Sequence, residues 1–255
     1  MDKTLTWFDR FTMMLTLKIS KTLLLLVGLP LVFLFNCLIA KFPTSPEFLP
    51  VKATDGKTFT FHPNTKWIGF DDKVCIDLQQ LKQFPNMESL EISCRTLSDL
   101  SPISQFGKLR FLNVNHTSVS DLAPLNKNKN LHTLFLNYTQ VVSLDSIPNL
   151  KNISKLGLSS TKVTSVDFVR HFPWLRHLDI RNTAVSNIKP IENSTQLIDI
   201  QLGNTKVSDV SPLYDLKYLV YVDIDNLKIP QKQIETFKEK NPYIKIIQHN
   251  SRWKF

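Results

Sequence analysis

The sequence predicts an α/β solenoid of short parallel strands, preceded by a single membrane-spanning helix. Apolar residues recur every 22 positions from Met87 to Ile229, and a stretch of 19 residues without a charge lies near the N-terminus. The composition of the 255 residues, 42% hydrophobic and 21% charged, supplies enough apolar side chains to bury a core. These proportions exclude a disordered, charge-rich tail.

The uncharged stretch covers residues 22–40, with the sequence TLLLLVGLPLVFLFNCLIA. As a helix it would extend about 28 Å, close to the thickness of a bilayer core. Lys18 and Lys21 precede it, whereas the ten residues after Lys41 contain no Lys or Arg, an imbalance that places the N-terminus in the cytoplasm. We therefore expect a cytoplasmic segment at 1–21, a transmembrane signal anchor at 22–40, a spacer and N-terminal cap at 41–64, and a repeat domain outside the cytoplasm at the inner membrane.

Three alternatives to an uncleaved anchor remain open. Cleavage after Ala40 would release a secreted protein, although Leu38 then stands at the −3 position, where signal peptidase prefers a small residue. Lipidation of Cys37 is disfavoured because Asn36 precedes it. A buried soluble helix fits poorly with the flanking lysines and with the Pro-containing spacer that follows.

The repeat has the pattern L-x-x-L-x-L, seven times over. Its first column is Met87, Leu109, Leu131, Ile153, Leu175, Leu197 and Leu219; its second is Leu90, Leu112, Leu134, Leu156, Leu178, Ile200 and Val222; its third is Ile92, Val114, Leu136, Leu158, Ile180, Leu202 and Ile224. Each motif predicts a short strand. A single unit cannot offset the entropy of ordering 22 residues, so the units must stack into one parallel sheet with strands about 4.8 Å apart.

Further apolar columns continue through the rest of each unit, where Pro102, Pro124, Pro190 and Pro212 share one position. Prolines at this spacing favour an extended or 3₁₀ return path over a long helix. Residues 65–86 fit the register as a degenerate first coil. After Pro230, QKQIETFKEKNP predicts an amphipathic helix and YIKII a final strand. We expect the solenoid at 65–240 and a C-terminal cap strand and tail at 241–255.

These units resemble the 22-residue leucine-rich repeats of bacterial internalin-type proteins over about residues 65–247. The resemblance implies a right-handed arc with a concave parallel sheet, and relatives that bind proteins, often host or envelope partners, on that concave face. The column that usually holds an inward asparagine here holds Thr117, Thr139, Thr161, Thr183 and Thr205. Their hydroxyls can make the same bonds to the backbone. We do not expect host-invasion or ubiquitin-ligase roles, because no cell-wall sorting signal or appended catalytic domain is found.

The positions between the strand leucines should face solvent on the concave side. We expect a protein-binding face there, with aromatic residues in the early coils and acids in the late ones. The candidate residues are Phe111, Asn113, His116, Phe135, Tyr138, His177, Asp179, Arg181, Asp199, Tyr221, Asp223 and Asp225. The alternative is that the aromatics only cover neighbouring strands and the acids form a solvated face.

Catalysis, metal binding and cofactors are not expected. The six glycines form no phosphate-binding loop, and the histidines form no H-E-x-x-H pair. Cys75 and Cys94 could form a disulfide if the domain is exported. In strict repeat register, however, Cys94 stacks over Asp72, three residues from Cys75, which makes the approach marginal; two thiols are the alternative.

The net charge of +9 first suggests nucleic acid. The candidate face is not basic, however, so we expect no nucleic-acid partner. The sequence therefore predicts a non-enzymatic, membrane-anchored protein that binds an unidentified protein on its concave face. The alternative is a secreted effector or toxin-neutralising protein with the same solenoid.

Overall fold

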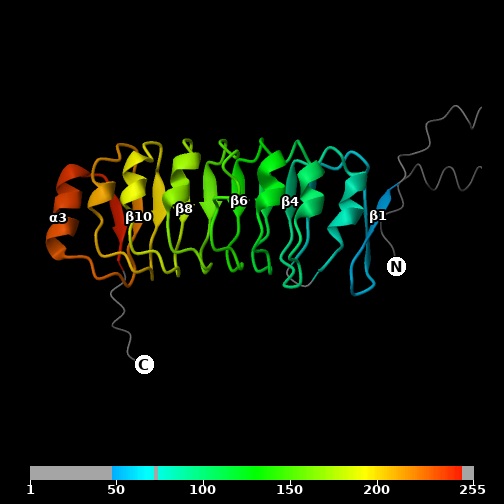
Figure 1. Cartoon of the computed structure of the whole chain (residues 1–255), viewed down its shortest axis with the longest axis horizontal. Helices are drawn as coiled ribbons and strands as arrows, with labels where there is room; N and C mark the ends of the chain where they lie inside the picture. The colour runs from blue at the N-terminus through cyan, green and yellow to red at the C-terminus, as the bar shows by residue number, and fades with distance from the viewer. Residues whose placement is uncertain (1–47, 72–73, 249–255) are drawn as a thin grey trace, which may run out of the picture. The chain divides into compact units, whose positions relative to one another are not determined.

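The computed structural model describes residues 48–71 and 74–248. The predicted membrane segment at 22–40 lies outside them. Within the described residues, no helix combines the length and hydropathy needed to cross a bilayer. The described residues form a solenoid in which β-strands follow one another along one side of the coils (Figure 1).

The predicted parallel sheet is present and has nine strands in sequence order. They are β3 (Trp67–Gly69), β4 (Ser89–Glu91), β5 (Phe111–Asn113), β6 (Thr133–Phe135), β7 (Lys155–Gly157), β8 (His177–Asp179), β9 (Asp199–Gln201), β10 (Tyr221–Asp223) and β11 (Lys245–Ile247). Partners differ by 22 residues throughout, as in Leu112 opposite Leu134, except that Tyr221 pairs with Lys245 across the last step. The central residue of each of the strands from β3 to β10 is buried, which confirms the predicted leucine columns.

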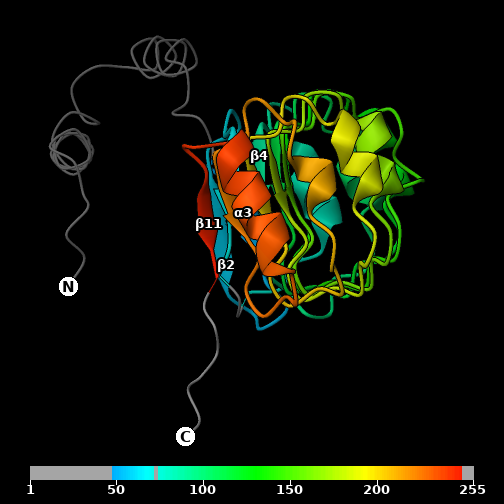
Figure 2. The same cartoon turned by 90° about the vertical axis from the view of Figure 1, so that its left-hand side faces the viewer.

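Short 3₁₀ helices lie on the return path of most coils, as the prolines predict. They are η1 (Leu78–Gln83), η2 (Ser101–Gln105), η3 (Ala123–Lys127), η4 (Asp167–His171), η5 (Lys189–Asn193) and η6 (Ser211–Leu213). Seen from the C-terminal end, they lie on the side of the coils opposite the strands (Figure 2). The coil after β6 has no 3₁₀ helix. There Pro148 occupies the position that Ser104 holds two coils earlier. Because proline has no backbone N–H, the 3₁₀ hydrogen bond from this position cannot form.

Threonine hydroxyls bond the backbone inside four consecutive coils. Thr117, Thr139, Thr161 and Thr183 each donate to the carbonyl three residues earlier, at 2.6–2.7 Å. The Thr205 hydroxyl also bonds the backbone, but as an acceptor: its Oγ1 accepts from Val207 N at 3.4 Å, while the Thr205 N–H donates to the Leu202 carbonyl. Each of these five threonines follows a residue with a left-handed backbone conformation. The φ angles of the five preceding residues lie between 55° and 59°.

Both ends of the solenoid are capped. At the N-terminal end, β1 (Leu49–Lys52) and β2 (Thr58–Phe61) form an antiparallel hairpin within the segment expected as a cap. Phe59 and Phe61 pack edge-to-face on Phe70 of the first coil, with ring centroids 5.2 and 6.0 Å away. At the C-terminal end, the predicted amphipathic helix is α3 (Gln231–Lys240), which buries Ile234 and Phe237.

A disulfide joins Cys75 to Cys94, with their Cα atoms 5.1 Å apart. Strict repeat register predicts only a marginal approach of these two residues. The first coil departs from strict register, because Val74 N donates to the Asp71 carbonyl in a turn and Ile76 pairs with Ala53 of the N-terminal segment. The bridge links the first coil to the second.

Candidate functional site

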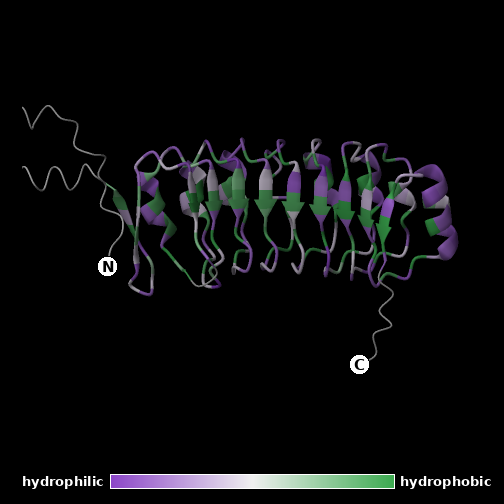
Figure 3. Ribbon diagram, turned by 180° about the vertical axis from the view of Figure 1, so that it is seen from behind, coloured by the Kyte–Doolittle hydropathy of each residue, from purple (hydrophilic) through white to green (hydrophobic). Residues whose placement is uncertain are grey.

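The strands of the sheet contain both hydrophilic and hydrophobic residues (Figure 3). Two of the predicted aromatic residues lie on neighbouring strands, on the open face of the sheet. The rings of Phe111 on β5 and Phe135 on β6 meet edge-to-face, with centroids 5.7 Å apart. Both residues are half-buried.

A second aromatic pair lies just beyond the ends of β5 and β6. His116 and Tyr138 occupy the left-handed positions of consecutive coils, with φ 57° each. Their rings stack at 4.3 Å between centroids and 11° between planes, and both are exposed. The structure thus brings together the four aromatic residues predicted for the early coils as two adjacent pairs.

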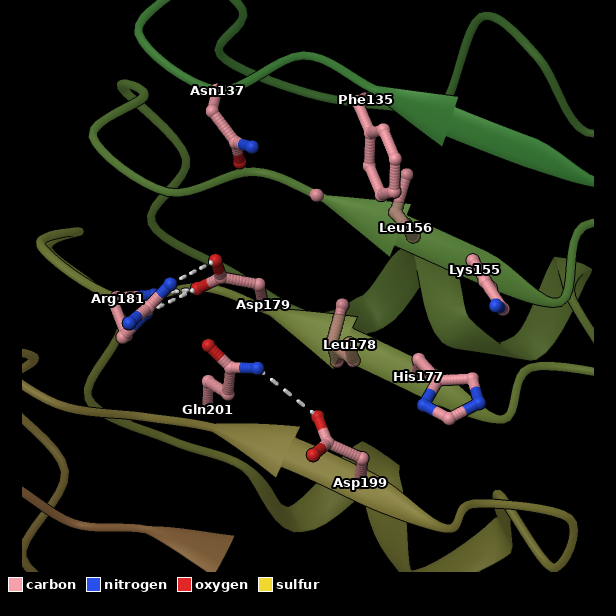
Figure 4. A pocket seen from close by; sticks show the side chains of 11 residues that line it. Phe135, Asn137, Lys155, Leu156, His177, Leu178, Asp179, Arg181, Asp199 and Gln201 are labelled. Atoms are coloured by element: carbon pink, nitrogen blue, oxygen red, sulfur yellow. Dashed lines mark hydrogen bonds and ion pairs between the residues drawn. The ribbon is translucent and has the colours of Figure 1, made fainter. Parts of the chain in front are cut away.

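A shallow hollow of about 280 Å³ lies between the aromatic residues and the polar residues of the later strands (Figure 4). Its lining comes from β6 to β9 and the turns after β6 and β8, and comprises Phe135, Asn137, Lys155, Leu156, Gly157, His177, Leu178, Asp179, Arg181, Asp199 and Gln201. Pockets that bind drug-sized molecules are usually larger and more enclosed than this hollow. The hollow has room for one or two amino-acid side chains.

Gly157 lines the hollow without a side chain of its own. Neighbouring strands carry Phe135 and Asp179 at the equivalent position. A Cβ atom added to Gly157 would lie 2.9 Å from both Phe135 Cδ1 and Asn137 Oδ1. Asn137 is itself fixed, since its Oδ1 accepts from Ser159 N at 2.8 Å. The missing side chain therefore lets the Phe135 ring and the Asn137 amide lean over β7.

The polar side of the hollow contains an ion pair and two further titratable groups. Arg181 donates through Nε and Nη2 to the two carboxylate oxygens of Asp179, at 3.0 and 2.8 Å. Asp179 holds the pKa of Arg181 above its usual value. Burial raises the pKa of Asp199, and a hydrogen bond from Gln201 Nε2 acts in the opposite direction. Burial lowers the pKa of His177, which the charge of Asp199 partly offsets.

The predicted cluster of four acids is reduced in the structure. Asp223 was expected on the solvent face, but it is only 6% exposed. Its carboxylate lies over Gly203, where an added Cβ would be 3.1 Å from Oδ2, and it accepts from Asp225 N at 2.9 Å. Because Asp179 is neutralised by Arg181, Asp199 is the acid that faces the hollow without such an ion pair. Tyr221 stands half-buried on β10 beyond it, and its pKa is raised, chiefly by burial.

Sequence reasoning missed two residues that shape this site. Gly157 has no side chain, whereas the neighbouring strands carry Phe135 and Asp179 at the same register position, a difference visible in the repeat alignment. Asn137 belongs to a chain of amides that continues from Asn115, whose Oδ1 accepts from Asn137 N at 2.7 Å. Asn113, a predicted contact residue, supports the same chain because its Oδ1 accepts from Asn115 N. No cluster of three or more potential metal ligands occurs among residues 48–71 and 74–248.

The environment of His177 gives a testable pH dependence. Its pKa should be measured below the usual value, and Asp199→Asn should lower it further, because the offsetting negative charge is removed. The His177 side chain is then protonated at a higher pH in the unfolded chain than in the folded one. This difference should lower the free energy of unfolding as the pH drops below about 6.5. NMR titration of the His177 ring tests this. A His177 pKa at or above the usual value, or a rise in Asp199→Asn, would contradict the assignment.

No protein-family model matches the sequence, and a search of curated proteins finds no match. Solved structures do match. Internalin C2 from Listeria monocytogenes aligns with a TM-score of 0.61 at 21% identity, over 68% of this chain and 74% of its own. An internalin, inlF, from the same organism aligns with a TM-score of 0.56 at 21% identity, over 69% of this chain and 60% of its own.

A third match is the leucine-rich-repeat ectodomain of the plant membrane receptor kinase GASSHO1/SCHENGEN3 from Arabidopsis thaliana, in complex with CASPARIAN STRIP INTEGRITY FACTOR 2. It aligns with a TM-score of 0.51 at 13% identity, over 59% of this chain and 22% of its own. The sheet, the 22-residue register and these matches together show a leucine-rich-repeat solenoid. Its repeats are similar to those of the bacterial internalins.

Proposed function

We propose that the chain is a non-enzymatic binding protein that holds a protein partner on the open face of its sheet. Leucine-rich-repeat proteins generally mediate protein–protein interaction, and the plant ectodomain above is in complex with another factor. The observation that carries the proposal is the hollow over Gly157, placed between the Phe111 and Phe135 pair and the polar group around Asp199. Partly exposed aromatic residues supply interface energy, and adjacent charges supply orientation.

The geometry favours binding over catalysis. Arg181 and Asp179 satisfy one another, as their two short hydrogen bonds indicate. His177 and Asp199 are neighbours across β8 and β9, and burial favours the neutral form of each. In this arrangement no nucleophile is activated by a base, as covalent catalysis requires. The pair suits recognition of a polar group on a partner.

We further propose that residues 22–40 anchor this bacterial protein in the inner membrane, with the solenoid outside the cytoplasm. The uncharged stretch and the lysines before it support this topology. The secreted alternative differs only in the mature N-terminus. Mass spectrometry of the protein isolated from membranes distinguishes the two: an intact N-terminus supports the anchor, and a mature chain beginning after residue 40 contradicts it.

Filling the hollow tests the binding face. Lys155 is exposed at the margin of the hollow, and Lys206 is exposed beyond the end of β9. Lys155→Trp should reduce the amount of crosslinked partner recovered from intact cells by about tenfold or more, because an indole occupies the space that the partner side chain needs. The matched control Lys206→Trp should leave recovery unchanged. Equal recovery with both variants would place the partner elsewhere.

A further inference from the structure

The turns that lead into the strands form a continuous edge of the solenoid. We name this the strand-start edge, and it comprises residues 85–88, 107–110, 129–132, 151–154, 173–176, 195–198, 217–220 and 241–244. Because β4 to β11 are parallel neighbours in one sheet, their starts all fall on the same side. It is the upper edge in Figure 3, where the strand arrows point downward.

The strand-start edge is strongly basic. Its eight turns contain six Lys or Arg and one acid; the basic residues, all exposed, are Lys108, Arg110, Lys129, Lys151, Arg176 and Lys217. The single acid, Glu88, lies 2.8 Å from Lys66 in an ion pair. Asp215, next to the edge, is held by Lys240 at 2.9 Å. The edge therefore keeps its excess of positive charge.

The opposite edge has no such excess. The strand-end edge comprises residues 93–101, 115–123, 137–145, 159–167, 181–189, 203–211 and 225–230. It contains six basic residues, Arg95, Lys162, Arg181, Lys189, Lys206 and Lys228, against six acids, Asp99, Asp121, Asp145, Asp167, Asp209 and Asp225. The excess of positive charge thus lies on the strand-start edge and not on the strand-end edge, which the net charge of +9 alone does not reveal.

Three exposed aromatic residues lie on the late turns of the strand-start edge. Trp174 and Tyr218 are each 59% exposed and Tyr243 is 94% exposed, although large apolar side chains are normally covered. Val220, 49% exposed, lies beside them in the turn before β10. Trp and Tyr are the residues that prefer the headgroup level of a bilayer, because their rings combine an apolar body with a polar tip.

We infer that the strand-start edge rests on an anionic bilayer surface. Lysines and arginines attract acidic headgroups within a Debye length, and the aromatic residues enter the headgroup region. The aliphatic Val220 among the rings favours a lipid surface over nucleic acid, whose bases stack on aromatic side chains but offer a valine little. This contact leaves the open face of the sheet free, so it is separate from partner binding and does not require residues 22–40 to span the membrane.

The test measures which edge approaches lipid, using the full chain with Cys37→Ser. A fluorophore is placed on Thr195→Cys at the strand-start edge or on Ser208→Cys at the strand-end edge; both positions are exposed and flank the same strand, β9. The chain is added to phosphatidylcholine nanodiscs with or without phosphatidylglycerol, with a quencher on the headgroups. Quenching at residue 195 should exceed quenching at residue 208 by about threefold or more in anionic discs, and the difference should disappear at about 1 M salt. The comparison is internal to one molecule, so any insertion of residues 22–40 affects both labels.

Charge-reversed variants provide the matched control. Lys129, Lys151 and Lys217 changed together to Glu should abolish the preferential quenching, whereas Lys162, Lys206 and Lys228 changed together to Glu should preserve it. Equal quenching at the two edges, or no dependence on lipid charge, would overturn the inference. The inference would also be overturned if the triple variant of Lys129, Lys151 and Lys217 lost binding to a DNA duplex but kept the nanodisc quenching. That result would identify nucleic acid as the ligand. Partner recovery is measured in parallel and should not change in either triple variant.

Discussion

The double variant Phe111→Ala, Phe135→Ala is expected to lose at least about tenfold in partner capture while remaining folded. The two rings support each other at 5.7 Å between centroids, and Phe135 also borders the hollow. Aromatic hot spots typically contribute about 2 kcal/mol or more each, and 1.4 kcal/mol corresponds to tenfold in affinity. Quantitative crosslinking from intact cells measures capture, and circular dichroism measures folding.

The matched control for this double variant is Trp174→Ala, Tyr218→Ala. These two aromatic residues are at least as exposed but lie on the strand-start edge, away from the sheet face. The control should retain capture. If the sheet-face double variant captures as much partner as the native chain, the aromatic pairs serve only to cover neighbouring strands.

The Leu134→Ala variant should lower the free energy of unfolding by about 2–5 kcal/mol, the cost of a cavity in a well-packed core. Leu134 has no exposed surface and lies between Leu112 and Leu156 in adjacent strands. In a solenoid each coil is stabilised mainly by its neighbours, so a cavity in a central coil weakens two interfaces together. Urea unfolding followed by circular dichroism gives the change.

Thr133→Ala on the same strand is the control for Leu134→Ala. Thr133 points toward the open face and is half-exposed, so its replacement should change stability by less than about 0.5 kcal/mol. Comparable losses for the two variants would show that β6 does not present alternate faces to the core and to solvent as described.

Much of the fold follows from the sequence because a solenoid repeats the same local structure in every unit. A column such as Leu90, Leu112 and Leu134 can be buried only if the units stack, so period and register together determine the sheet. The return path was also predictable, because proline fixes φ and favours a tight turn. The same logic fails after β6, where Pro148 is displaced from the proline column and the 3₁₀ helix is absent.

Features that break the repeat could not be derived from periodicity. Asn128 occupies a column otherwise held by residues such as Phe106 and Leu150. It is fully buried, and its amide donates to the carbonyls of Ile103 and Phe106 in the preceding coil at 3.0 and 2.9 Å. Nothing in the sequence alone distinguishes this buried, hydrogen-bonded asparagine from an exposed one.

The candidate site was predicted only in part for a related reason. Alternation identifies which residues leave the core, but it does not reveal how far each side chain extends or which partner it meets. Asp223 folds onto the space over Gly203, and Asp179 is neutralised by Arg181. Alignment of the repeats reveals that Gly157 has no side chain, but it does not reveal that the Phe135 ring and the Asn137 amide lean over it.

Site-specific photocrosslinking in intact cells tests whether the partner binds the open face of the sheet. A photoreactive phenylalanine derivative replaces Phe111 on the open sheet face or, in a second chain, Glu192 on the exposed return path. Both chains keep the same core and the same caps. We expect a discrete crosslinked partner at position 111 and none at position 192. The same partner crosslinked at position 192, with none at position 111, would contradict this expectation.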